Sequence, residues 1–89
     1  MEQKVALVTG GASGIGEEVC RLLAEHQFLV AVCDIDRDKA ETVARSIGGI
    51  GVECDVASPQ SVQSAASRCK AELGAPDFAH LNAGIMTSP

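Results

Sequence analysis

The residues whose types and spacing point most directly to chemistry form a glycine-rich segment near the N-terminus. Residues 9–16 read T-G-G-A-S-G-I-G and join a short apolar run to an amphipathic segment. A nucleotide pyrophosphate is bound by backbone N–H groups at the start of a helix, and side chains would block its approach. We therefore predict a pyrophosphate-binding loop here. The alternative is a tight strand–helix turn that binds no ligand.

The spacing of this loop excludes two other glycine-rich loops. A P-loop ends in G-K-S/T, whereas Gly16 is followed by Glu17, whose carboxylate would repel a phosphate. A nucleophile elbow, G-x-S-x-G, needs a glycine two positions after the serine, but Ile15 stands two positions after Ser13. The loop reads T-G-x-x-x-G-x-G, which also departs from the G-x-G-x-x-G spacing of dinucleotide folds.

An acidic residue, Asp34, ends the second apolar run of the chain. It follows Gly16 by about 20 residues, the position at which a carboxylate accepts hydrogen bonds from an adenosine ribose. A carboxylate there repels a ribose 2′-phosphate, so we expect NAD to be preferred over NADP. Arg37 would soften this preference, whereas Ser13 stands where a basic residue would favour NADP. The alternative role for Asp34 is to cap the next helix.

Two further polar positions end the third and fourth apolar runs. Asp55 is placed to accept a hydrogen bond from an adenine amino group, with Val56 against the ring, or else to cap the following helix near Ser58. After the fourth run, Gly84 permits close approach of the backbone to a ribose, and the Asn82 amide is able to bridge neighbouring strands. We expect all of these residues to meet at one edge of a sheet.

Short apolar runs alternate with amphipathic segments along the whole chain. The runs cover residues 4–9, 28–33, 50–54 and 77–81, and runs of this kind are typical of strands buried on both faces of a parallel sheet. The predicted apolar helix faces between them are Ile15, Val19, Leu22, Leu23 and His26; Ala40, Val43, Ala44 and Ile47; and Val62, Ala65, Ala66, Cys69 and Leu73.

Helix-end signals agree with this division. Asp36 is expected to cap the second helix, and Ser58, followed by Pro59, the third. Gly48 and Gly74 stand where the ends of these two helices favour a left-handed residue.

The alternation predicts an α/β fold, a doubly wound parallel sheet with right-handed crossovers. Such a sheet normally has about six strands, whereas this sequence supplies four, the last of which would be an apolar edge strand. We therefore expect residues 1–89 to be one partial domain of a longer protein.

Composition excludes several classes of function. The 89 residues include two Phe and no Tyr or Trp, too few aromatic side chains for base stacking, and the net charge of −5 argues against binding a phosphate backbone. The four cysteines have no metal-ligand spacing, so we expect free thiols and no metal site. No signal peptide or membrane-spanning segment is visible, so we expect a cytoplasmic protein with no membrane or nucleic-acid partner.

Taken together, these motifs resemble those of the short-chain dehydrogenases/reductases. The resemblance is carried by residues 9–16, Asp34, residues 55–56 and residues 82–84, which occur in the order of that family and extend over the whole chain. It implies a Rossmann-like sheet truncated after about four strands, in the order 3-2-1-4. It also implies that the residue matching Thr9 helps to brace the central strands.

The resemblance implies a set of residues that contact an NAD cofactor. The loop would contact the pyrophosphate and nearby ribose, Asp34 the adenosine ribose, residues 55–56 the adenine, and residues 82–84 a ribose. The implied cofactor-binding residues are Gly10, Ser13, Gly14, Ile15, Gly16, Asp34, Ile35, Asp55, Val56, Asn82, Ala83 and Gly84.

The sequence departs from the family in two ways. Leu81 replaces the first Asn of the usual N-N-A-G, and the chain has no tyrosine, so the family's catalytic Tyr-x-x-x-Lys pair is absent and no catalytic residue is assigned. The expected function is the dinucleotide-binding portion of an NAD-dependent oxidoreductase that transfers a hydride between nicotinamide and a small alcohol or carbonyl substrate. We expect that protein to be a homo-oligomer and this chain alone to be inactive. The alternative is a non-catalytic nucleotide-binding module.

Overall fold

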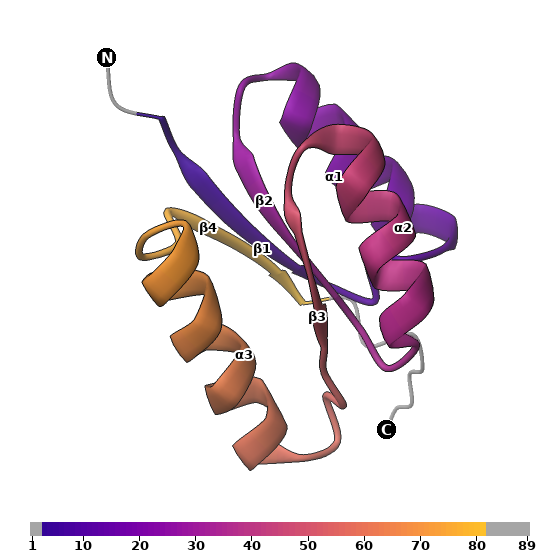
Figure 1. Cartoon of the computed structure of the whole chain (residues 1–89), viewed down its shortest axis with the longest axis vertical. Helices are drawn as coiled ribbons and strands as arrows, with labels where there is room; N and C mark the ends of the chain where they lie inside the picture. Colours follow the sequence, from indigo (N-terminus) through magenta and orange to yellow (C-terminus); the bar gives the residue numbers. More distant parts are fainter. Residues whose placement is uncertain (1–2, 82–89) are drawn as a thin grey trace.

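The computed structural model describes residues 3–81 as an alternation of strands and helices (Figure 1). The strands are β1 (Val5–Thr9), β2 (Leu29–Asp34), β3 (Ile50–Glu53) and β4 (Phe78–Leu81), and the helices are α1 (Gly14–Glu25), α2 (Arg37–Ile47) and α3 (Pro59–Glu72). Neighbouring strands pair in parallel in the order β3-β2-β1-β4. The predicted α/β Rossmann-like sheet and its strand order are confirmed.

The sheet is covered on both faces, as a parallel sheet requires. Helices α1 and α2 lie on one face and α3 on the other (Figure 1). Because side chains alternate along a strand, β1 and β2 each contribute buried residues to two cores. The core on the α3 side contains Val5, Leu7, Ala31, Cys33, Val52, Cys54, Ala65 and Cys69. The core on the side of α1 and α2 contains Val8, Cys20, Val30, Val32, Ala40, Val43 and Ala44.

The predicted apolar face of the first helix is wrong in part. Ile15 is 71% exposed and Leu22 is 55% exposed, whereas Gly16 and Cys20 are the buried positions of α1. Helix α1 begins so close to the glycine loop that only a small residue fits against it, and this contact fixes which side of the helix faces the sheet. His26, also predicted on the apolar face, is exposed.

The second and third helices follow the prediction more closely. Ala40, Val43 and Ala44 are buried and Ile47 packs against them. In α3, Ala65 and Cys69 are buried, but Ala66 is exposed and does not belong to the predicted face.

Both predicted N-caps are confirmed. The Asp36 side chain accepts a hydrogen bond from the backbone N–H of Lys39, and the Ser58 side chain accepts one from that of Ser61. Gly48, with φ of 73°, and Gly74, with φ of 118°, adopt the positive φ expected after helices α2 and α3.

Parallel pairing brings the carboxyl ends of all the strands to one edge of the sheet. Thr9 is in register with Cys33 of β2 and with Leu81 of β4, and Asp34 is in register with Glu53 of β3. The segments that follow β1, β2 and β3 therefore begin at this edge, as expected for the predicted site.

The cysteines are buried free thiols, as predicted. Within residues 3–81, no cluster of His, Cys, Asp and Glu side chains is arranged to hold a metal ion. None of the helices in this range combines the length and the apolar character needed to cross a membrane.

Burial of two of these thiols leads to a prediction about alkaline stability. Burial raises the pKa of Cys20 and of Cys33 from 9.0 to about 12, so both stay protonated in the folded chain while unfolded thiols ionise. Since the folded state then holds more protons, its stability is fully present below pH 9.0 and falls as the pH rises towards 12. The expected slope is up to about 1.4 kcal/mol per pH unit for each thiol. Urea denaturation from pH 7 to pH 11 measures it.

The variant Cys33→Ala separates this effect from general alkaline damage. The variant is expected to be less stable at neutral pH but to lose stability less steeply between pH 9 and pH 11. A slope equal to that of the unmodified chain would show that the Cys33 thiol does not contribute.

Candidate functional site

The glycine loop between β1 and α1 is built around left-handed backbone and a close approach. Gly10 has φ of 63° and Gly14 has φ of 58°, a region that side chains disfavour. A Cβ atom on Gly16 would overlap the carbonyl oxygen of Gly10. The first turn of α1 is therefore pressed against the loop, and no residue other than glycine fits at position 16.

Gly14 differs from Gly16 in what surrounds it. A Cβ atom on Gly14 would meet no protein atom within 4 Å. The positive φ of Gly14, rather than packing within the described chain, accounts for a glycine there. Apart from the two chain neighbours of Gly14, residues 3–81 leave open space beside this backbone at the start of α1.

The N-terminus of α1 is left uncapped. Ser13 occupies the N-cap position but makes no side-chain capping hydrogen bond, in contrast to Asp36 in α2 and Ser58 in α3. The first N–H groups of a helix have no partner within the helix, and its dipole places partial positive charge there. This end of α1 is suited to an anion.

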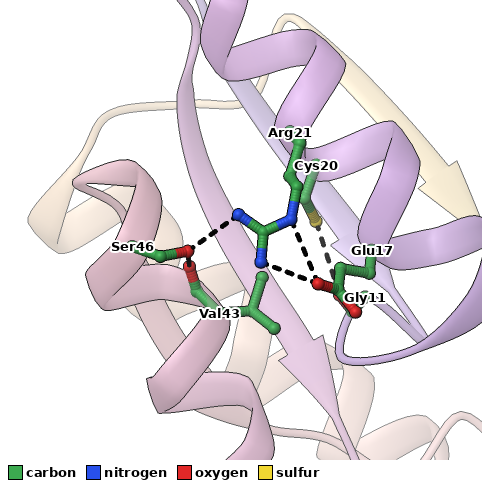
Figure 2. A network of polar contacts seen from close by, with 6 residues as sticks. All are labelled: Gly11, Glu17, Cys20, Arg21, Val43 and Ser46. Carbon is green, nitrogen blue, oxygen red and sulfur yellow. Dashed lines mark hydrogen bonds and ion pairs between the residues drawn. The ribbon is translucent and has the colours of Figure 1, made fainter.

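The loop is tied to its surroundings on several sides. Its Gly11 N–H donates to the Cys33 carbonyl at 2.9 Å, and its Ala12 N–H donates to Asp34 Oδ2 at 3.1 Å. The Cys20 thiol lies 3.8 Å from the Gly11 carbonyl oxygen, as Figure 2 shows. Gly11 and Ala12 were not singled out from the sequence, because these contacts join distant segments.

Asp34 is held by both of its carboxylate oxygens. Oδ2 accepts from Ala12 in the loop, and Oδ1 accepts from the Asp36 N–H at 3.0 Å. The N-cap of α2 is Asp36, so the alternative that Asp34 caps this helix is wrong. Asp34 lies beside the loop with its orientation fixed, at the end of β2.

Asp55 organises the turn that leads into α3. Its Oδ1 accepts from the Ala57 N–H at 2.9 Å, and its backbone N–H donates to Ser61 Oγ at 2.9 Å. The cap itself is Ser58, whose N–H donates to the Asp55 carbonyl at 2.9 Å. Asp55 therefore supports the cap rather than forming it.

A network of hydrogen bonds around Arg21 connects helix α1 to α2 (Figure 2). The guanidinium donates to Glu17 Oε2 at 2.7 and 3.0 Å and to Ser46 Oγ at 3.0 Å, and Ser46 Oγ donates to the Val43 carbonyl at 2.7 Å. The spacing of Glu17 and Arg21 is a detectable i,i+4 signal, but nothing in the sequence links either residue to Ser46. The network holds the exposed side of α1 beside α2.

Three apolar side chains lie exposed at the carboxyl edge of the sheet. Ile15 is 71%, Ile35 is 66% and Val56 is 42% exposed. They stand at the start of α1, directly after β2 and shortly after β3. These segments, which are far apart in sequence, thus present apolar groups near the polar loop, a combination that suits a flat ring attached to an anionic group.

The last predicted element of the site is only partly described. Thr9 Oγ1 donates to the His80 carbonyl at 3.5 Å and so links β1 to β4. Asn82, Ala83 and Gly84 lie outside the described residues.

Known proteins are similar to this chain in both sequence and fold. The family model "short chain dehydrogenase" matches residues 4–89. A (-)-isopiperitenol/(-)-carveol dehydrogenase, mitochondrial, from Mentha piperita is 46% identical over 89 residues, covering 96% of this chain and 34% of its own length. The chain spans about a third of the length of the curated relatives it matches.

Two solved structures from Brucella melitensis superimpose well. A 3-ketoacyl-(acyl-carrier-protein) reductase complexed with NADH has a TM-score of 0.83 at 32% identity, over 88% of this chain and 33% of its own. A structure described as ribose-5-phosphate isomerase has a TM-score of 0.87 at 37% identity, over 94% of this chain and 33% of its own. The family model covers nearly the whole chain, and this protein belongs to the short-chain dehydrogenase family.

Proposed function

We propose that residues 1–89 form the dinucleotide-binding part of an NAD-dependent oxidoreductase. The observation that carries this proposal is the uncapped N-terminus of α1 beside the open space at Gly14. Backbone N–H groups at such a site bind a pyrophosphate without any obstructing side chain. The loop residues Gly10, Ser13, Gly14, Ile15 and Gly16 would hold it.

The charge around Asp34 supports NAD rather than NADP. A fixed carboxylate at the end of β2 accepts hydrogen bonds from ribose hydroxyls and repels a 2′-phosphate. Arg37, the nearby cation expected to soften this preference, has its Nε 3.4 Å from Glu41 Oε2, which directs its charge along α2. Bound NADH in the related reductase agrees with a nicotinamide dinucleotide of this kind.

The adenine end would lie between β2 and β3. Ile35 and Val56 offer exposed apolar surface for the ring, and Asp55 Oδ2 has no partner within residues 3–81, which leaves it able to accept from the amino group. Residues 82–84 would complete the ribose contacts.

The hydride transfer itself requires groups that this sequence does not contain. The chain has no tyrosine to act as the acid/base of the family, so we propose that it binds the cofactor while further residues of a longer protein act on a small alcohol or carbonyl substrate. That protein would be a homo-oligomer. The same absence favours the second candidate, a non-catalytic nucleotide-binding module. Binding of NADH to the chain distinguishes both candidates from a ligand-free domain. Alcohol-dependent NAD reduction is expected only from a longer protein that contains this chain, and it distinguishes the first candidate from the second.

Two glycines provide a matched test of the pyrophosphate site. Gly14 and Gly48 both have positive φ and open space around an added Cβ, so Gly14→Ala and Gly48→Ala should each cost about 1–2 kcal/mol of stability. Only Gly14→Ala should weaken NADH binding, by about tenfold, because only there would the methyl group stand between backbone and phosphate. NADH fluorescence measures binding in a chain without tryptophan. Equal loss of affinity in both variants would refute the proposed site.

A second pair of variants tests the ribose contact. Asp34→Asn removes the negative charge and is expected to shift the ratio of NADPH to NADH affinity towards NADPH by about tenfold or more. Asp36→Asn changes the same charge two residues away, at the α2 N-cap, and should leave that ratio unchanged. Titration of each variant with both reduced cofactors gives the two ratios, and an unchanged ratio for Asp34→Asn would contradict the assignment.

A further inference from the structure

The outer edge of β3 is bordered by two adjoining hollows that the proposed dinucleotide site does not use. One, of about 440 Å³, is lined by residues 52–53, and the other, of about 210 Å³, by residues 49–51. Both are walled by α2 and α3, and they share Glu41 and Arg68. Together they form one channel along the strand, which we name the β3 groove.

The floor of the β3 groove is an unpaired strand edge. In the described chain β3 pairs with β2 alone. The Cys54 N–H donates to the Asp34 carbonyl at 2.9 Å and so points inward. Because N–H groups alternate in direction along a parallel strand, those of Gly51 and Glu53 point to the open side. Such a row of free donors and acceptors is a template for another strand.

Helices α2 and α3, which form the walls of the β3 groove, determine what kind of strand fits there. A Cβ atom on Gly51 would lie 2.6 Å from the Cα atom of Glu41, so α2 sits directly over β3. Helix α2 also packs against β2, so it covers the inner side of β3 and leaves the outer edge of the strand open between α2 and α3. An extended segment that carries no helix of its own suits a channel of this form.

The charges of the groove favour an acidic occupant. Arg45 lines the α2 wall and forms no ion pair within residues 3–81. Arg68 lines both hollows from α3, and its partner at 2.7 Å, Glu72, is itself 44% exposed, so the pair is easily exchanged. The two hollows are also lined by Arg37 and by the carboxylates of Glu41 and Glu53, and Arg37 pairs with Glu41. Within a chain of net charge −5, the lining therefore carries three guanidinium groups against two carboxylates, with a guanidinium on each wall.

We propose that the β3 groove binds an extended acidic peptide, which adds to the sheet as a strand beside β3. Side chains of an added strand alternate between the two walls. Carboxylates on opposite faces of the peptide would therefore reach Arg45 and Arg68, while its backbone pairs with the free edge. Because β3 has only four residues, the complex is expected to be weak and reversible.

The test uses the full chain and a fluorescein-labelled synthetic peptide in which pairs of glutamates alternate with pairs of valines, so that adjacent carboxylates face opposite sides of the extended strand. Fluorescence anisotropy should show saturable binding that weakens as salt is raised. Arg45→Glu and Arg68→Glu should each lower the affinity about tenfold. Lys70→Glu makes the same charge change on α3 at an exposed position that lines neither hollow, and it should change the affinity less than twofold.

A second probe separates strand addition from charge attraction alone. The same peptide with alternate backbone amides N-methylated keeps its charge but loses the hydrogen bonds to the edge, and it should bind at least tenfold more weakly. Equal binding of the two peptides, equal loss in Lys70→Glu and Arg68→Glu, or no binding of the unmodified peptide would each overturn the proposal. Circular dichroism confirms that each variant is folded, and Arg68→Gln replaces Arg68→Glu if the latter is not.

Discussion

The close approach of α1 to the glycine loop is the constraint on which the rest of this structure depends. No side-chain atom fits between Gly16 and the Gly10 carbonyl, so the helix starts directly against the end of β1. This contact sets the rotation of α1, buries Cys20 and leaves Ile15 exposed. It also aims the free N–H groups of the first turn at the carboxyl edge of the sheet, where the other strand ends converge.

Asp34 joins the geometry of the loop to the charge of the site. A carboxylate close to a pyrophosphate would oppose binding if its charge were unbalanced. Here each oxygen accepts a backbone N–H, one from Ala12 and one from Asp36, and charge-assisted bonds of this kind offset part of that charge. The same two bonds fix the side chain in place, so the proposed selectivity at the ribose and the rigidity of the loop depend on one residue.

The elements of this fold were predictable where local pattern and packing agree. Strands buried on both faces are nearly continuous apolar runs, and the Asp36 and Ser58 caps depend on residues three positions away, so both could be inferred from the sequence. The predicted apolar face of α1 is wrong in part because a glycine and a cysteine form the buried side of the helix. Neither residue type contributes strongly to an apolar periodicity. Tertiary packing, rather than apolar periodicity, determines which face of α1 is buried, and Ile15 and Leu22 are exposed as a result.

The candidate site, too, has features that could be predicted from the sequence and features that could not. Its glycines and acidic residues could be proposed from residue type and order alone, because a pyrophosphate-binding loop would require glycines at these positions. The bonds that organise it could not be, because Ala12 to Asp34 and Arg21 to Ser46 join segments 22 and 25 residues apart. The order of strands and helices along the sequence predicts which strand ends meet at one edge of the sheet. Which atoms are in contact at that edge depends on how each helix is rotated against the sheet, and the sequence order does not predict this rotation.

The carboxyl edge of the sheet, where β3 ends, and the lateral edge, along which β3 runs, carry charges of opposite sign. Helix α2 lies between these two edges. At the carboxyl edge, Asp34 and Asp55 place fixed negative charge beside the uncapped helix, which suits a ligand with hydroxyl and amino donors around its phosphates. Along the lateral edge, Arg45 and Arg68 place positive charge over unpaired backbone. Arg37 stands between the two, and its pairing with Glu41 draws its charge towards the groove and away from the ribose position. The proposed preference for an unphosphorylated ribose and the proposed affinity for acidic peptides therefore both depend on where these charges lie, with carboxylates at or after the ends of β2 and β3 and guanidinium groups on α2 and α3.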